Sequence, residues 1–193
     1  AGFDLATLKT ELARVVKPSG YIACFGTIPL LASFINPFDI RYSGVWLKPS
    51  GTMRTATAKK PMSKCEPYAV FCIKNAKICD MTFNRLKIEN AGKPYKIVQN
   101  NTGYKREGKD SLARANTSGW TQDGYISEND GFRWQTDVIE APNKPSMKHA
   151  ERTEHPTQKP IQALSILVKM LSNEGDLVLD CFGGSGSTGA TCL

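Results

Sequence analysis

A glycine-rich segment near the end of the chain has the composition of a ligand-binding turn. Apolar residues lead to Asp180, and the sequence FGGSGSTG then follows from Phe182. Because glycine has no Cβ, Gly183, Gly184 and Gly186 can bring backbone close to a ligand and adopt positive φ angles. Free N–H groups at the start of a following helix would add to such a site. Segments of this kind bind NAD, FAD, phosphates or S-adenosylmethionine, and this one has neither the GxGxxG nor the Walker spacing.

A second segment, HPTQKP at His155–Pro160, brings a histidine, a hydroxyl group and an ammonium group close together. The apolar residues between the two segments predict the elements that position them. The sequence IQALSILVKML, from Ile161, has the period of an amphipathic helix, whereas Val178 and Leu179 predict a buried strand. A further helix is expected to begin after Gly186.

The first part of the chain predicts two helices and three strands. Apolar residues at helical spacing indicate a helix over residues 5–16, which a Pro and a Gly then end. YIACFG at residues 21–26 predicts a buried strand, and a short helix is expected to begin near Pro29. IRYSGVWLK at 40–48 and EPYAVFCIK at 66–74 predict two more strands, because they are dense in β-branched and aromatic residues.

Between the last two predicted strands lies a basic loop of small polar residues. No acidic residue occurs between Asp39 and Glu66. The loop is either a solvated linker or a site of phosphate contact, and the sequence does not decide between them. Its cations are Lys48, Arg54, Lys59, Lys60 and Lys64.

Residues 76–150 differ in character from the rest of the chain. Periodicity weakens there, and glycine, asparagine, lysine and aromatic residues are mixed. The stretch is too long for a plain loop, so we expect an irregular inserted subdomain with short β segments.

Composition and charge narrow the class of protein. The 193 residues are 40% hydrophobic and 22% charged, which is ordinary for a globular protein. No apolar run reaches the roughly 18 residues of a membrane span, and the amphipathic start does not have the pattern of a signal peptide. The net charge of +7 arises from ten basic against four acidic residues in 1–75, twelve against nine in 76–150, and three against five in 151–193. This distribution favours a polyanionic partner, although many basic soluble proteins bind nothing anionic.

The cysteines and histidines predict no metal site. Six cysteines occur without a CxxC pair, and the two histidines are not at zinc-finger spacing. We therefore expect reduced thiols and a cytoplasmic protein.

The two segments, in this order, resemble the β-class DNA amino-methyltransferases. In that family an H-P-T-x-K-P segment precedes a D-P-F-x-G-S-G-T loop that holds S-adenosylmethionine. The rest of the chain falls into register with it: Trp46 and Lys48 match the family's Trp-x-Lys strand, and Glu66 matches the strand opened by a His-Glu pair. The resemblance covers essentially the whole chain and implies an α/β, Rossmann-like methyltransferase fold in permuted order.

The resemblance also implies an organisation and a site. Residues 1–75 would be the catalytic half, 76–150 the target-recognition region and 151–193 the cofactor half. The implied partner is double-stranded DNA, whose adenine or cytosine amino group is methylated from S-adenosylmethionine; homodimerisation and a cognate restriction endonuclease stay open. Implied cofactor contacts are Asp180, Phe182, Gly183, Gly184, Ser185, Gly186, Thr157 and Lys159. Implied DNA contacts are Lys48, Arg54, Lys59, Lys60, Arg133 and Trp134, with Trp120 and Tyr125 as further aromatic candidates. His155 is expected to be a hydrogen-bonded structural residue.

The sequence departs from the family in four places. The catalytic tetrapeptide D/S/N-P-P-Y/F/W is absent, since NPFD at 36–39 and CEPY at 65–68 are in the wrong register. Cys181 replaces the usual proline of D-P-F, and Cys65 stands where histidine is common. The acidic residue that follows the glycine-rich helix in the family is not found before Leu193. We therefore expect no methyl transfer by this chain alone.

Other functions remain open on the sequence. The first alternative is a DNA-binding remnant of a methylase that has lost its chemistry, and the second is a methyltransferase of RNA or protein. A nucleotide-binding oxidoreductase is the weakest alternative, because HPTQKP has no role in it.

Overall fold

The computed structural model describes residues 4–52, 59, 61–99, 125–143, 153–155 and 157–193. They form two compact units, a body from residues 1–86 and 135–193 and an insert from residues 87–134. The insert lies inside the region 76–150 that the sequence sets apart, and the flanking residues on both sides of it belong to the body.

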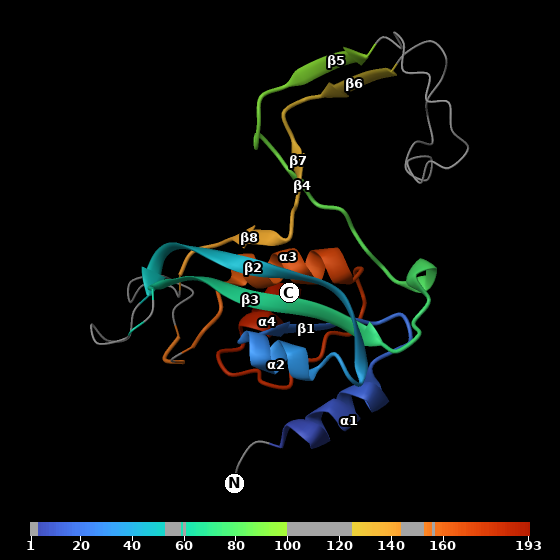
Figure 1. The fold of residues 1–193 in the computed structure, drawn as a ribbon, viewed down its shortest axis with the longest axis vertical. Coiled ribbons are helices and arrows are strands. Elements are labelled where there is room, and N and C mark those ends of the chain that lie inside the picture. Colours follow the sequence, from blue (N-terminus) through green and yellow to red (C-terminus); the bar gives the residue numbers. More distant parts are fainter. Residues whose placement is uncertain (1–3, 53–58, 60, 100–124, 144–152, 156) are drawn as a thin grey trace. The chain divides into compact units, whose positions relative to one another are not determined.

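A four-stranded sheet forms the centre of the body (Figure 1). Its order is β1-β3-β2-β8, with β1 and β2 antiparallel to β3 and with β8 parallel to β2. The strands are β1 (Ile22–Phe25), β2 (Phe38–Thr52), β3 (Ser63–Ile73) and β8 (Val138–Glu140). The first three strands were predicted, whereas the short β8 gave no sequence signal.

Residues 68–72 of strand β3 are buried on both faces of the sheet, which explains the continuous apolar sequence there. Tyr68 and Val70 pack on one face with Ala163 and Leu167 of α3 (Ile161–Leu171). On the other face, a second cluster contains residues of β1, β2 and β3 together with α2 (Ile28–Ser33), and α1 (Leu5–Val15) packs against it. The sheet therefore lies between α3 and the α1–α2 pair.

The helices begin where the sequence predicts. Asp4 caps α1, because its side chain accepts a hydrogen bond from the Ala6 backbone N–H at 3.0 Å. Pro29 lies in the first turn of α2, where a missing N–H is harmless. A single 3-10 turn, η1 (Ile78–Asp80), follows β3. None of the helices in the described part of the chain is long and apolar enough to cross a membrane.

The described part of the insert contains two short antiparallel ribbons. Strand β4 (Lys87–Ile88) pairs with β7 (Arg133–Trp134), and β5 (Tyr95–Gln99) pairs with β6 (Tyr125–Asn129). The chain leaves the body after Leu86 and returns at Gln135, whose backbone N–H donates to the Leu86 carbonyl oxygen at 2.8 Å.

The predicted buried strand at Val178 and Leu179 is wrong for this structure. The segment is irregular, and Leu177 and Leu179 are 89% and 64% exposed. A strand needs a neighbour for its backbone N–H and C=O groups, and no described strand pairs with these residues. The helix expected after Gly186 is present as α4 (Ser187–Cys192). All six cysteines are free in this structure.

Asn84 closes the carboxyl end of α3 and provides a test of the fold. Its Nδ2 donates to the carbonyl oxygens of Lys169 at 3.0 Å and Ser172 at 2.9 Å. Because helix-terminal carbonyls lack partners within the helix, we expect Asn84→Ala to destabilise the protein by about 1–2 kcal/mol. Urea unfolding measures the change. The control is Asn36→Ala, which removes only an exposed bond to Lys74, and an equal loss in both variants would contradict the assignment.

Candidate functional site

The segment that contains HPTQKP is folded back on itself by a buried glutamine. Gln158 is only 4% exposed, and its Oε1 accepts hydrogen bonds from the backbone N–H of Thr153 at 3.0 Å and from its hydroxyl at 3.2 Å. Pro160 is fully buried and stands at the N-cap of α3. The segment is therefore fixed at both ends, which holds its intervening side chains in place.

His155 lies directly against the glycine-rich loop. A Cβ built on Gly184 would lie 2.8 Å from His155 Nε2, so only glycine allows this approach. The Nδ1 atom of the same ring accepts a hydrogen bond from the Thr157 backbone N–H at 3.3 Å. These contacts fit the structural role expected for His155 and bring the two predicted segments together.

The glycine-rich loop has the conformation that its glycines permit. Gly184 and Gly186 have φ angles of 38° and 72°, whereas Gly183 does not have a positive φ. Asp180 Oδ1 accepts a hydrogen bond from the Phe182 backbone N–H at 2.8 Å, which shapes the turn before the loop. A Cβ on Gly183 or Gly186 would meet nothing within 4 Å, so the loop has open space beside its backbone.

Lys159 lies in a cluster of three charged side chains, together with Lys48 and Glu66. The Nζ atom of Lys159 is 2.9 Å from Glu66 Oε1, and the Nζ atom of Lys48 is 3.1 Å from Glu66 Oε2. The side chains are partly buried, with 27%, 15% and 25% exposure for Lys159, Lys48 and Glu66. We call these residues the charged triad.

Two aromatic rings support the charged triad. The Trp46 ring centroid lies 4.6 Å from Lys48 Nζ and 5.9 Å from Lys159 Nζ, and Phe25 lies 5.6 Å from Lys159 Nζ. The indole N–H of Trp46 donates to the Ala141 carbonyl oxygen at 3.1 Å, which fixes the ring. Both ammonium groups therefore rest against the same buried indole.

The two lysines keep Glu66 ionised. Burial raises the pKa of the Glu66 carboxyl, but the hydrogen bonds and positive charges of Lys159, and then of Lys48, outweigh burial and hold this pKa below its ordinary value. The charged triad therefore carries one net positive charge at neutral pH. Sequence reasoning misses this role, because Glu66 lies within a strand-like pattern that does not distinguish it from a solvated residue.

Lys48 does not belong with the exposed cations of the predicted basic loop. Its side chain is paired with Glu66 and mostly buried, so its ammonium group is committed to a carboxylate rather than presented for a phosphate. Lys59 is exposed. The expected DNA contacts Arg54 and Lys60, and the aromatic candidate Trp120, lie outside the described residues.

Arg133 and Trp134 form part of an aromatic and cationic cluster in the insert. The guanidinium carbon of Arg133 lies 5.6 Å from the Tyr95 ring centroid, and Lys87 Nζ lies 4.6 Å from that of Phe132. Trp134 packs edge-on against Phe132 and is 44% exposed. Exposed aromatic rings beside cations suit a nucleic acid, but a protein surface can have the same composition.

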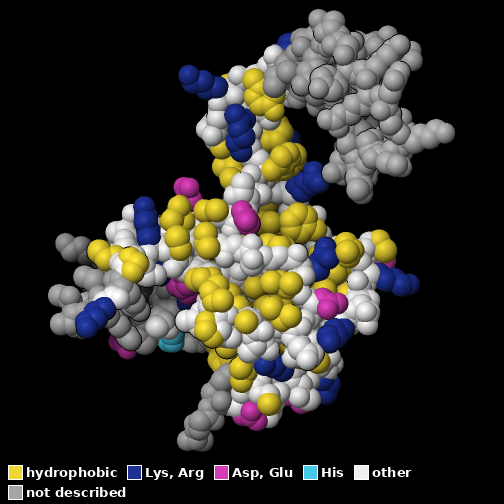
Figure 2. Space-filling view, viewed as in Figure 1, with side chains coloured by type: hydrophobic (Ala, Val, Ile, Leu, Met, Phe, Trp, Pro, Cys, Tyr) yellow, Lys and Arg dark blue, Asp and Glu magenta, His cyan; other side chains and the backbone are white. Residues whose placement is uncertain are grey.

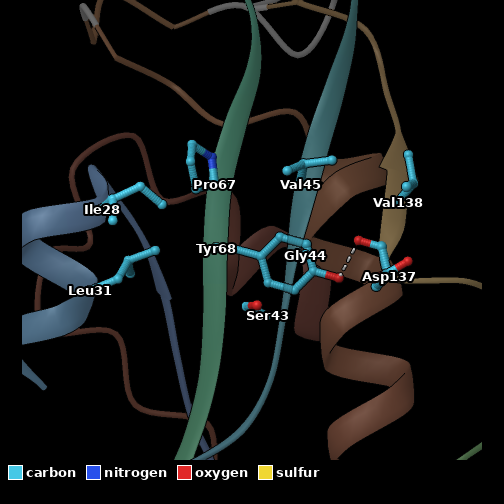
Figure 3. Close-up of a pocket in the computed structure, with 9 residues that line it drawn as sticks. All are labelled: Ile28, Leu31, Ser43, Gly44, Val45, Pro67, Tyr68, Asp137 and Val138. Atoms are coloured by element: carbon cyan, nitrogen blue, oxygen red, sulfur yellow. Dashed lines mark hydrogen bonds between the residues drawn. The ribbon is translucent and has the colours of Figure 1, made fainter. Parts of the chain in front are cut away.

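A shallow apolar hollow of about 300 Å³ lies elsewhere in the body (Figure 3). Ile28 and Leu31 of α2 face Val45 and Val138 across it, and the Tyr68 hydroxyl donates to the Asp137 carbonyl oxygen at 3.0 Å. Figure 2 shows hydrophobic side chains gathered on one face of the body. The lining includes none of the expected cofactor contacts, so the hollow is not the candidate cofactor site.

Comparisons with known proteins identify the family. The family model for N6 and N4 methyltransferases, described as DNA methylase, matches residues 6–193. The structure of the M1.HpyAVI–SAM complex has a TM-score of 0.57 at 20% identity and covers 99% of this chain and 71% of that chain. A structure of M1.HpyAVI has a TM-score of 0.54 at 17% identity and covers 99% of this chain and 69% of that chain.

These matches confirm the Rossmann-like methyltransferase fold and the resemblance on which it was predicted. They also confirm, as the activity of the family, the methylation of DNA amino groups with S-adenosylmethionine as cofactor. The chain belongs to the N6/N4 family of DNA methylases.

Proposed function

We propose that this chain binds S-adenosylmethionine at the glycine-rich loop and serves methyl transfer to an adenine or cytosine amino group in double-stranded DNA. The observation that carries the proposal is the contact of His155 with Gly184, which joins the HPTQKP segment to the loop. This contact supports the proposal, because it brings together two segments that characterise the family.

The residues of the site fit the chemical groups of the cofactor. Asp180 is an exposed carboxylate suited to the cofactor's ammonium group, and Lys159 is a cation suited to its carboxylate. Phe182 is 63% exposed beside the loop and offers an apolar surface. The glycines and Ser185 offer backbone and a hydroxyl group, and Thr157 is exposed on the facing segment. When bound, the cofactor supplies the methyl group of a sulfonium that an amino nitrogen can attack, so alignment is the main task of the protein.

We propose that these 193 residues bind the cofactor but are not sufficient by themselves to transfer the methyl group. The catalytic tetrapeptide of the family does not occur in them. For DNA, we propose contacts from Arg133 and Trp134 in the insert and from Lys59, supported by the net charge of +7 and by their exposure. Action in the cytoplasm is part of the proposal, whereas dimerisation and a cognate endonuclease remain predictions.

Calorimetric titration of S-adenosylmethionine into the chain tests the proposal. We expect micromolar binding, and a decrease in affinity of about tenfold for Asp180→Ala, because one partly exposed charge pair contributes about 1.4 kcal/mol. Asp176→Ala is the matched control: its carboxylate also accepts one backbone N–H at 2.8 Å, from Asn173, but lies before the loop. Its affinity should stay within twofold of the wild type.

Two outcomes would contradict the proposal. A folded wild-type chain that does not bind the cofactor would favour the DNA-binding remnant, and equal losses for the two aspartate variants would remove Asp180 from the site. Competition between duplex DNA and RNA for the chain then distinguishes a DNA enzyme from an RNA methyltransferase.

A further inference from the structure

The two ammonium groups of the charged triad repel each other. Lys48 and Lys159 both rest against the Trp46 ring, and each is bonded to a different oxygen of Glu66. Two ammonium groups so close together in a partly buried place repel each other strongly, because the local dielectric constant is well below that of water. Glu66 is the counter-ion that allows both to stay there.

The side chains of the two lysines are not equally enclosed. Lys48 follows directly after Leu47 of β2, which is paired with Cys65 of β3 on one side and with Glu140 of β8 on the other. Lys159 lies in the irregular segment before α3. If the carboxylate were removed, the Lys159 side chain would move away into solvent, because it is the more exposed of the two, at 27% against 15% for Lys48.

Lys159 also has capacity to bind a second anion. An ammonium group has three donors, and Glu66 is the acceptor of one ion-pair contact at 2.9 Å. The side chain remains 27% exposed, and the charged triad has a net charge of +1, which suits a single carboxylate. The same segment carries His155, which lies against Gly184 of the loop.

We infer that Glu66 is a positioning residue for the cofactor: as the shared counter-ion of Lys48 and Lys159, it holds Lys159 where that lysine binds the cofactor's carboxylate. The inference rests on the proposed cofactor site and deepens it. Glu66 itself does not touch the cofactor, and it acts only through Lys159.

Calorimetry with two ligands tests this inference. S-adenosylmethionine carries the carboxylate, whereas 5′-methylthioadenosine has the same nucleoside without the amino-acid portion. We expect Glu66→Gln to weaken binding of S-adenosylmethionine about tenfold and to leave binding of 5′-methylthioadenosine within twofold. The control is Glu11→Gln, which breaks the exposed ion pair with Arg14 and should change neither affinity.

A double substitution separates positioning from a general effect on packing. In Glu66→Gln with Lys48→Met, the repelling ammonium group is gone and the net charge of +1 is restored, so most of the lost affinity should return. Lys159→Met provides an independent variant that keeps the Glu66–Lys48 pair. It should show the same loss for S-adenosylmethionine alone, and it remains informative if Glu66→Gln does not fold.

The outcomes distinguish the inference from the proposed function. If the wild type binds S-adenosylmethionine and Glu66→Gln binds it equally or more tightly, the inference is overturned and the proposed function stands. Equal losses for both ligands, or no recovery in the double variant, would show that Glu66 only supports the fold. A folded wild-type chain that binds no S-adenosylmethionine contradicts both.

Discussion

Gly44→Ala is expected to lower the free energy of unfolding by about 3 kcal/mol or more, at the upper end of what overpacking a core costs. The new Cβ would lie 2.0 Å from the Asp137 carbonyl oxygen and 2.6 Å from the Tyr68 hydroxyl oxygen. Neither atom can move freely, because the Asp137 carbonyl accepts hydrogen bonds from the Val45 backbone N–H at 3.0 Å and from the Tyr68 hydroxyl at 3.0 Å. The pairing of β2 with β8 must therefore shift.

Urea unfolding of Gly44→Ala measures this loss. Gly189→Ala, in α4, is the matched control, because its Cβ would meet nothing within 4 Å. Alanine there should raise the stability by roughly 0.5–1 kcal/mol, since it is a better helix former than glycine. A loss below about 1 kcal/mol for Gly44→Ala would mean that the strands relax without cost, contrary to the packing described here.

Gly184→Val is expected to weaken binding of S-adenosylmethionine about 100-fold, which corresponds to about 2.8 kcal/mol. Valine disfavours the φ angle of 38° at this position, and its Cβ would lie 2.8 Å from His155 Nε2. The loop and the imidazole ring cannot both keep their places. Because buried Gln158 and Pro160 fix the HPTQKP segment, the glycine-rich loop would be the part that shifts, and its proposed contacts with the cofactor would be lost.

The control for this variant separates the effect of the contact with His155 from the effect of placing valine at a positive φ angle. Gly175→Val places valine at a φ angle of 84° with no atom within 4 Å, so it should lower stability while the folded fraction keeps its affinity within twofold. Replacing His155 with alanine in the Gly184→Val background should recover part of the affinity. If affinity does not recover, strain at Gly184, and not the imidazole contact, causes the loss.

The elements with a clear local pattern could be predicted from the sequence. Helix α3 has an amphipathic period and β3 a run of apolar residues, and both were found where expected. Val178 and Leu179 show where this reasoning fails. An apolar run indicates that a segment is suited to burial, but a strand also needs a partner strand, which no local pattern reveals.

The charged triad could not be predicted for a different reason. Lys48, Glu66 and Lys159 come from two strands and a distant segment, and their meeting depends on the register of β2 against β3 and on the path before α3. A single glutamate inside a strand-like sequence is usually a solvated edge residue. The positive φ angles of Gly184 and Gly186 were easier to anticipate, because glycine is the residue that adopts such angles without a steric penalty.

The hydrogen bond between Gln135 and Leu86 has a consequence for how such a protein can diversify. The chain leaves and re-enters the body at adjacent backbone positions. The entropic cost of closing the intervening segment therefore changes only slowly with the length of that segment. Segments of other lengths and sequences can replace residues 87–134 without disturbing the sheet or the glycine-rich loop. Evolution can thus exchange the insert while it conserves the body.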